Sequence, residues 1–277
     1  KSSGYCTFQK QRMDEVEKKV KAEIKSGRKM TIKEVKTTAK KTFAPGLYDL
    51  TELQRDANKR FGYSAKETLN IMQRLYESHK VLTYPRTDSR YITTDVADTL
   101  KERLKACSVG PYRKLAGSLS MRPIRKNASF VDNKKVTDHH ALIITEDPAR
   151  GLSEDQQLVY DMIAGRMLEA FGEGCVKENT AVTLKAGGVH FVAKGSIMLH
   201  PGWRNVFGAD REETTDEDLT VLPDLTEGDK PAVRDVEVQE RQTKPKPLHT
   251  EATLLSAMES AGREIENEEE REAMKDA

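Results

Sequence analysis

The chain has 277 residues, of which 33% are charged and 36% hydrophobic, and its formal net charge is +1. No apolar stretch reaches the roughly 18 residues of a membrane-spanning helix, and no charged-then-apolar leader opens the chain. Its three cysteines (Cys6, Cys107 and Cys175) form neither a disulfide framework nor a Cys-x-x-Cys zinc site. We therefore expect an intracellular protein of about two domains. The charged run that stops at Ala277 leads us to expect a piece of a longer protein.

The near-zero net charge conceals a segregation along the chain. Residues 1–43 hold 13 basic and 5 acidic residues, and residues 80–150 hold 14 basic and 8 acidic ones. Residues 210–240 reverse the balance, with 12 acidic against 3 basic. A single charge run usually marks a solvated face. Two basic segments on either side of a chemically suggestive motif favour a polyanionic partner instead.

Helical patterns dominate the middle of the chain. Thr51 with Gln54, and Ser64 with Glu67, match the capping-box pattern. Residues 10–42 read as a basic, partly strand-like segment of weak periodicity, and residues 106–137 read as irregular. Apolar spacing and capping signals together predict five helices, over 51–61, 64–78, 94–104, 153–171 and 250–258.

From Thr180 the apolar period changes from that of a helix to that of a strand. The alternation around Gly187-Gly188 predicts a β-hairpin, and further strand patterns occur at 220–222 and 233–239. Two prolines near residue 246 mark a linker.

The most informative stretch is Val81-Leu82-Thr83-Tyr84-Pro85-Arg86-Thr87-Asp88-Ser89-Arg90. Pro85 fixes its own backbone and favours an extended Tyr84, so the phenol should project from a stiff corner. A Tyr hydroxyl is a poor nucleophile at neutral pH unless positive charge or a base lies beside it. Arg86 keeps its proton and can hold a phosphate oxygen through two parallel donors. The residues therefore make Tyr84 a candidate nucleophile for attack on a phosphodiester.

This stretch, together with Leu75-Tyr76-Glu77, resembles the active-site signature of type IA DNA topoisomerases, and its wording is most similar to the topoisomerase III branch. Two further motifs resemble the family in the expected order. They are Thr137-Asp138-His139-His140-Ala141-Leu142-Ile143-Ile144-Thr145, where Ile144 replaces a frequent Pro, and Leu248-His249-Thr250-Glu251-Ala252-Thr253-Leu254-Leu255.

The resemblance implies an enzyme that cuts one DNA strand through a 5′-phosphotyrosyl link, passes another strand and reseals the break without ATP. It implies catalytic roles for Tyr84 and Arg86, with His139 near the scissile phosphate; His140 receives no role. The implied DNA-binding residues are Thr87, Asp88, Ser89, Arg90 and His139.

The resemblance also implies a multidomain α+β fold, in which a mainly helical nucleophile-bearing domain is inserted in a β-rich arch. The expected segments are 1–43 (arch), 44–179 (helical), 180–248 (returning arch) and 249–277 (start of a fourth domain). The family's magnesium ligands lie in a toprim domain that precedes these residues. We therefore expect Mg²⁺ in the full-length enzyme, no metal or cofactor in this chain, and no cleavage by the chain alone. The expected partner is single-stranded DNA, bound by a monomer associated with the cytoplasmic nucleoid.

Two alternatives remain open. The helix pair over 51–78 has a helix-turn-helix outline and could belong to a nucleic-acid-binding module without covalent chemistry. A tyrosine recombinase or relaxase also uses a Tyr, but the sequence lacks the spacing of the Arg/His set or the His cluster that these enzymes need.

Overall fold

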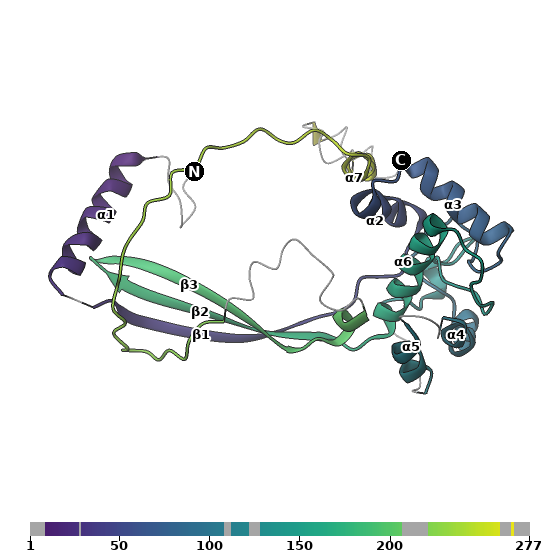
Figure 1. Cartoon of the computed structure of the whole chain (residues 1–277), viewed down its shortest axis with the longest axis horizontal. Coiled ribbons are helices and arrows are strands. Elements are labelled where there is room, and N and C mark those ends of the chain that lie inside the picture. Colours follow the sequence, from purple (N-terminus) through teal and green to yellow (C-terminus); the bar gives the residue numbers. More distant parts are fainter. Residues whose placement is uncertain are drawn as a thin grey trace. The chain divides into compact units, whose positions relative to one another are not determined.

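The computed structural model describes residues 9–27, 29–107, 112–121, 128–206, 221–260 and 267–268. It combines α-helices with one antiparallel sheet (Figure 1). The chain divides into two compact units. The first comprises Lys1–Thr42, Gly174–Gly202 and Arg211–Pro245, and the second comprises Phe43–Glu173, Trp203–Asp210 and Lys246–Ala277. In the described part of the chain, no helix is long and apolar enough to span a membrane.

The first unit contains one helix and three long strands. Helix α1 (Lys10–Lys25) precedes β1 (Thr31–Thr42), which pairs antiparallel with β2 (Cys175–Ala186), and β2 pairs with β3 (Val189–His200). The partly strand-like character expected over 10–42 is confirmed by β1, whereas the helix α1 was not expected. The polar, lysine-rich composition of this segment hid the helix, which buries only Val20, and the strand is exposed along most of its length.

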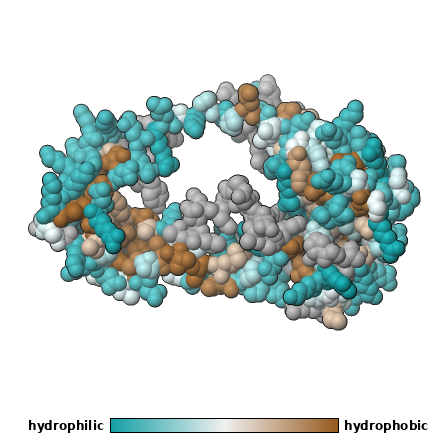
Figure 2. Space-filling view, viewed as in Figure 1, coloured by the Kyte–Doolittle hydropathy of each residue, from teal (hydrophilic) through white to brown (hydrophobic). Residues whose placement is uncertain are grey.

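The hairpin between β2 and β3 is confirmed, with Gly187 and Gly188 both at positive φ (58° and 75°). This two-residue turn matches the right-handed twist of its strands because glycine tolerates positive φ at both positions. Large apolar side chains remain exposed on β3, and hydrophobic residues follow the sheet in Figure 2. They are Val192, Ile197 and Leu199.

The strands expected at 220–222 and 233–239 are not formed by the described residues 221–245, and Thr220 lies outside the described part. This segment instead touches β1 through two backbone hydrogen bonds. The Ile32 N–H donates to the Asp229 carbonyl (2.9 Å), and the Gly228 N–H donates to the Ile32 carbonyl (3.0 Å). Prolines at 223 and 231 remove backbone donors that a continuing ladder would need.

The second unit is helical, and all five predicted helices are confirmed. They are α2 (Leu50–Phe61), α3 (Ala65–Glu77), α4 (Thr94–Ala106), α6 (Glu154–Phe171) and α7 (Glu251–Glu259). The region expected to be irregular contains α5 (Arg113–Ser120) and a 3₁₀ turn, η2 (Asn133–Lys135); a second turn, η3, covers Gly202–Val206.

Local capping explains where these helices begin. Capping boxes start α3 at Ser64 and α6 at Ser153 as expected. The box expected at Thr51 was wrong, because α2 begins one residue before it. The Asp49 carboxylate accepts the Glu52 N–H at 2.6 Å and caps this helix. The cap therefore comes from the loop that precedes α2.

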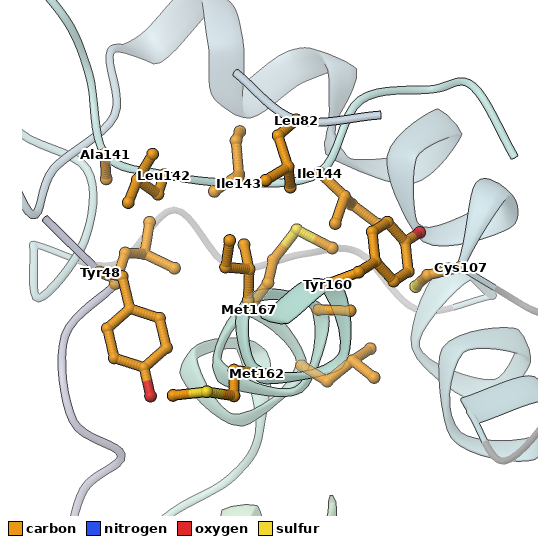
Figure 3. Packing of buried hydrophobic residues seen from close by; sticks show 14 of the residues in the cluster. Tyr48, Leu82, Cys107, Ala141, Leu142, Ile143, Ile144, Tyr160, Met162 and Met167 are labelled. Carbon is orange, nitrogen blue, oxygen red and sulfur yellow. The ribbon is translucent and has the colours of Figure 1, made fainter. Parts of the chain in front are cut away.

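Helix α6 forms the centre of the helical core. It is buried on nearly every side, as expected for a helix enclosed by other elements. Figure 3 shows the segment Ala141–Ile144 lying over this helix, which contributes Met162 and Met167 to the core. The core therefore supports the second family-like motif directly.

Candidate active site

The segment that carries Tyr84 follows α3 through a tight reversal. Lys80 has a left-handed backbone conformation (φ 58°), the one positive φ among the described non-glycine residues. The chain then pairs with the second motif, because the Thr83 N–H donates to the Ile143 carbonyl at 3.1 Å. Pro85 follows and is buried. Tyr84 thus stands at the end of a short extended stretch, as the sequence predicted.

The Tyr84 side chain is 36% exposed and lies between two other rings. Its ring centroid is 4.3 Å from that of His139, with a 39° interplanar angle, and 5.6 Å from that of Tyr76, in an edge-on arrangement. None of the residues that the structure describes forms a hydrogen bond with its hydroxyl. Packing therefore orients the ring while leaving the residue partly exposed.

Arg86 and Asp88 alternate with buried residues along the same loop. Both side chains are exposed, and within the described ranges neither forms an ion pair or hydrogen bond. An exposed guanidinium two residues from the phenol can bind a phosphate oxygen without first breaking an internal pair. The local arrangement is therefore suited to an anionic substrate.

Thr87 and Ser89 are buried, each 6% exposed. The Thr87 hydroxyl donates to the His139 carbonyl at 3.0 Å, and the Ser89 hydroxyl donates to the Lys135 carbonyl at 2.7 Å. These bonds join the Tyr84 loop to the segment that carries the two histidines. Two of the predicted DNA-binding side chains therefore hold the loop in place.

Arg90 also points to protein partners. Its Nε donates to Asp49 Oδ2 at 2.6 Å, and its Nη2 lies 3.2 Å from Glu52 Oε2. Glu52 in turn pairs with Arg55, which pairs with Glu259 on α7. A chain of ion pairs thus runs from the Tyr84 loop across α2 to α7.

The two adjacent histidines have different surroundings. His139 is exposed and packs on Tyr84, whereas His140 is half-buried with its Nδ1 2.8 Å from the Ala141 carbonyl. Burial lowers the pKa of His140 below its ordinary value. The geometry therefore brings His139, the residue that the sequence favoured, to the candidate nucleophile.

Among the residues that the structure describes, no three His, Cys, Asp or Glu side chains gather closely enough to hold a metal ion. The acidic stretch 216–218 lies outside those residues. The described residues thus offer no ligand set for the magnesium ion that the sequence resemblance implies. The expectation that its ligands belong to another domain stays a prediction.

The sequence motifs missed three residues near the site. Tyr76 was part of a quoted motif but was not expected to touch Tyr84. Asp49 and Glu52 were not singled out, although an Asp just before a helix is a typical cap. That capping pattern could have identified Asp49, but no local signal indicated that it also binds Arg90.

A family model described as DNA topoisomerase matches residues 4–263, nearly the whole chain. The chain belongs to this DNA topoisomerase family. The expected family is thereby confirmed, and the exposed Tyr84 lies in the matched region.

Similar curated proteins are named DNA topoisomerase 3. That of Bacillus cereus (strain ATCC 14579) is 46% identical over 259 residues, which are 92% of this chain and 35% of that protein. That of Bacillus subtilis (strain 168) is 46% identical over 248 residues, which are 88% of this chain and 34% of that protein. This chain therefore spans about a third of these relatives.

Among solved structures, full-length topoisomerase I from Thermotoga maritima is similar, with a TM-score of 0.65 and 25% identity. The match covers 92% of this chain and 40% of that chain. It supports the mixed fold of helices and antiparallel sheet.

Proposed function

We propose that this chain supplies the nucleophile of a type IA topoisomerase, with Tyr84 attacking a phosphodiester of single-stranded DNA. The observation that carries the proposal is the partly exposed Tyr84, whose ring packs against His139 and which lies two residues from the exposed Arg86. The phenol oxygen forms a bond to phosphorus, and the bond from phosphorus to the 3′ oxygen breaks. The phenol loses its proton, and the departing 3′ oxygen gains one.

The product is a 5′-phosphotyrosyl link and a free 3′ hydroxyl. One phosphate ester replaces another, so attack by that hydroxyl reseals the strand and restores the phenol. The phosphoester bond is conserved throughout, and the reaction therefore needs no ATP. This accounting supports a cycle in which another strand passes while the first is held covalently.

The surrounding side chains suit different steps of this reaction. Arg86 would bind a non-bridging phosphate oxygen and stabilise the charge that grows in the transition state. His139 would donate to the phosphate and keep the Tyr84 ring in place. Asp88 is exposed and would orient a donor, while Thr87 and Ser89 shape the loop by their internal hydrogen bonds.

For the longer enzyme we propose relaxation or decatenation of DNA by strand passage, by a monomer associated with the cytoplasmic nucleoid. The helical segment 44–179 would carry the nucleophile, and 1–43 with 180–248 would form an arch that opens. Residues 249–277 would begin a fourth domain. The division into a β-rich unit and a helical unit supports this assignment.

The decisive experiment replaces Tyr84 with Phe in a longer enzyme that includes the preceding domain. We expect covalent protein–DNA adducts and relaxation to be lost, while binding of a labelled single strand is largely retained. Tyr91→Phe is the matched control, because Tyr91 follows the same loop and contacts Lys135 rather than His139. Full activity of Tyr84→Phe would instead favour a binding module without covalent chemistry.

For the 277-residue chain alone we propose weak binding of single strands without cleavage. Binding should fall steeply with added salt because it depends on backbone phosphates. A covalent adduct between the isolated chain and an oligonucleotide in magnesium buffer would contradict the proposed dependence on another domain.

A further inference from the structure

A pocket of about 360 Å³ lies in the first unit, where β1 begins and β2 ends. Its wall includes the Gly187-Gly188 turn and four lysines from three separate stretches of sequence. The lysines are Lys29, Lys33, Lys185 and Lys230. One acidic side chain, Glu23 of α1, also lines the pocket.

Backbone pairing brings these lysines together. Lys185 lies opposite Thr31 in the ladder of β1 and β2, and Lys33 occupies the irregularity between Ile32 and Glu34. A bulge of this kind turns a side chain out of the regular alternation of a strand. Lys230 directly follows Asp229, whose carbonyl accepts the Ile32 N–H at 2.9 Å. Segments about 150 and 200 residues apart along the chain thus meet around one hollow.

The charge of the pocket is largely uncompensated. All four lysines are exposed, and none of them forms an ion pair with any residue in the described ranges. Glu23 is engaged locally, because its carboxylate accepts the Gly187 N–H. Four ammonium groups and one occupied carboxylate therefore leave an excess of positive charge around the cavity.

We propose that this pocket binds the phosphate backbone of a DNA strand, at a site separate from Tyr84. Lysine ammonium groups are mobile point charges that suit phosphates of variable position. None of the described residues that line the pocket carries an aromatic ring on which a base could stack. Binding here is therefore independent of base sequence and depends strongly on salt.

This inference rests on the proposed function. Because DNA is the proposed substrate, DNA phosphate is the anion that we expect in the pocket. An acidic polypeptide offers carboxylates to the same ammonium groups. The proposed DNA chemistry and the basic segment 1–43, which contains Lys29 and Lys33, favour the nucleic acid.

The first test is lysine footprinting of the unmodified chain. The chain is acetylated with and without an oligothymidylate in low salt, and each lysine is quantified by mass spectrometry. We expect at least threefold protection of the four pocket lysines. The matched controls are Lys10, Lys18, Lys40 and Lys244, which are exposed, belong to the same unit and do not line the pocket. Equal modification of both sets overturns the proposal.

The second test changes the four pocket lysines to Gln and compares this variant with the four control lysines changed to Gln. For single strands, each phosphate contact contributes about 0.7 to the magnitude of the slope of log affinity against log salt concentration. Loss of four contacts should therefore reduce the magnitude of this slope by about 2 to 3 in the pocket variant. The control variant should keep most of its slope. Equal slopes for the two variants overturn the proposal, with circular dichroism verifying that both fold.

Competition distinguishes the source of the anion. Polyglutamate or inorganic phosphate that protects the pocket lysines better than oligothymidylate, at equal charge concentration, overturns the assignment to DNA. Tyr84→Phe separates this inference from the proposed function. Protection of the pocket lysines should persist in that variant, whether or not the longer enzyme forms adducts.

Discussion

The guanidinium of Arg90 donates from Nε to Asp49 Oδ2 at 2.6 Å, while the other oxygen of Asp49 caps helix α2. One carboxylate therefore joins the Tyr84 loop to the start of a helix. The Leu50 N–H reinforces this link by donating to the Thr87 carbonyl at 2.9 Å. The position of the candidate nucleophile thus depends on α2 as well as on its own loop.

Replacing Arg90 with Ala should impair cleavage by the longer enzyme more than it impairs binding of DNA. The loss of the pair should loosen the loop and destabilise the helical unit by about 1 kcal/mol, since the pair is partly exposed. Urea unfolding and single-turnover cleavage check the two effects. Arg90→Lys should restore part of the cleavage rate. Weaker binding with an unchanged cleavage rate at saturating DNA would instead assign Arg90 to DNA contact.

His139 combines a ring that packs on Tyr84 with nitrogens that can donate to phosphate. His139→Phe retains a ring and removes the donors, whereas His139→Ala removes both. Loss of a hydrogen bond to a charged group costs about 1.5–3 kcal/mol, so the Phe variant should cleave roughly 10- to 100-fold more slowly. The Ala variant should be slower still, measured as single-turnover adduct formation. Equal rates for Phe and wild type would exclude the donor role.

Arg166 is buried, forms hydrogen bonds with three groups of the helical unit and also pairs with Glu169, whose Oε2 lies 3.6 Å from its Nε. Its Nη2 lies 2.8 Å from Asp56 Oδ2 and 3.0 Å from the Tyr48 hydroxyl, and its Nη1 donates to the Gly46 carbonyl. Arg166→Met should destabilise the unit by about 3–5 kcal/mol because the carboxylates of Asp56 and Glu169 both lose the guanidinium. Urea unfolding measures this loss. Adding Asp56→Asn should recover part of it, and a double variant that is less stable than Arg166→Met would contradict this explanation.

His140 predicts a pH dependence of stability. Burial lowers its pKa in the folded state, so the unfolded chain binds the proton more readily. Its contribution to stability is complete above the unfolded pKa of about 6.5 and declines as the pH falls through that value. His140→Gln should flatten the profile of unfolding free energy between about pH 5 and 7. An unchanged profile would show that other groups cause the dependence.

The two turn glycines should differ in their tolerance of a side chain. A Cβ on Gly187 would lie 3.0 Å from the backbone of Lys19 in α1, whereas one on Gly188 would meet nothing within 4 Å. Both positions have positive φ, so each alanine costs about 1–2 kcal/mol from strain. Gly187→Ala should lose additional stability in thermal unfolding because α1 must shift. Equal losses of stability in the two variants would show that α1 can shift without destabilising the unit.

Short-range patterns in the sequence were sufficient for most elements. Capping boxes and apolar spacing located α3, α6 and the other predicted helices, because helix starts and amphipathic faces depend on residues a few positions apart. The two glycines located the hairpin for the same reason. The Tyr84 motif and its order relative to two other motifs were enough to indicate the family.

Contacts between distant segments were decided only by tertiary structure. The guanidinium of Arg90 could by its chemistry bind a phosphate, but Arg90 lies beside Asp49 and forms an internal ion pair with it. Thr87 and Ser89 are turned inward by the segment that carries His139. Their neighbours lie about 40 to 50 residues away along the chain, so no local pattern specifies them. The sequence alone thus determined which residues could react, whereas packing decided which of them face solvent and which hold the loop.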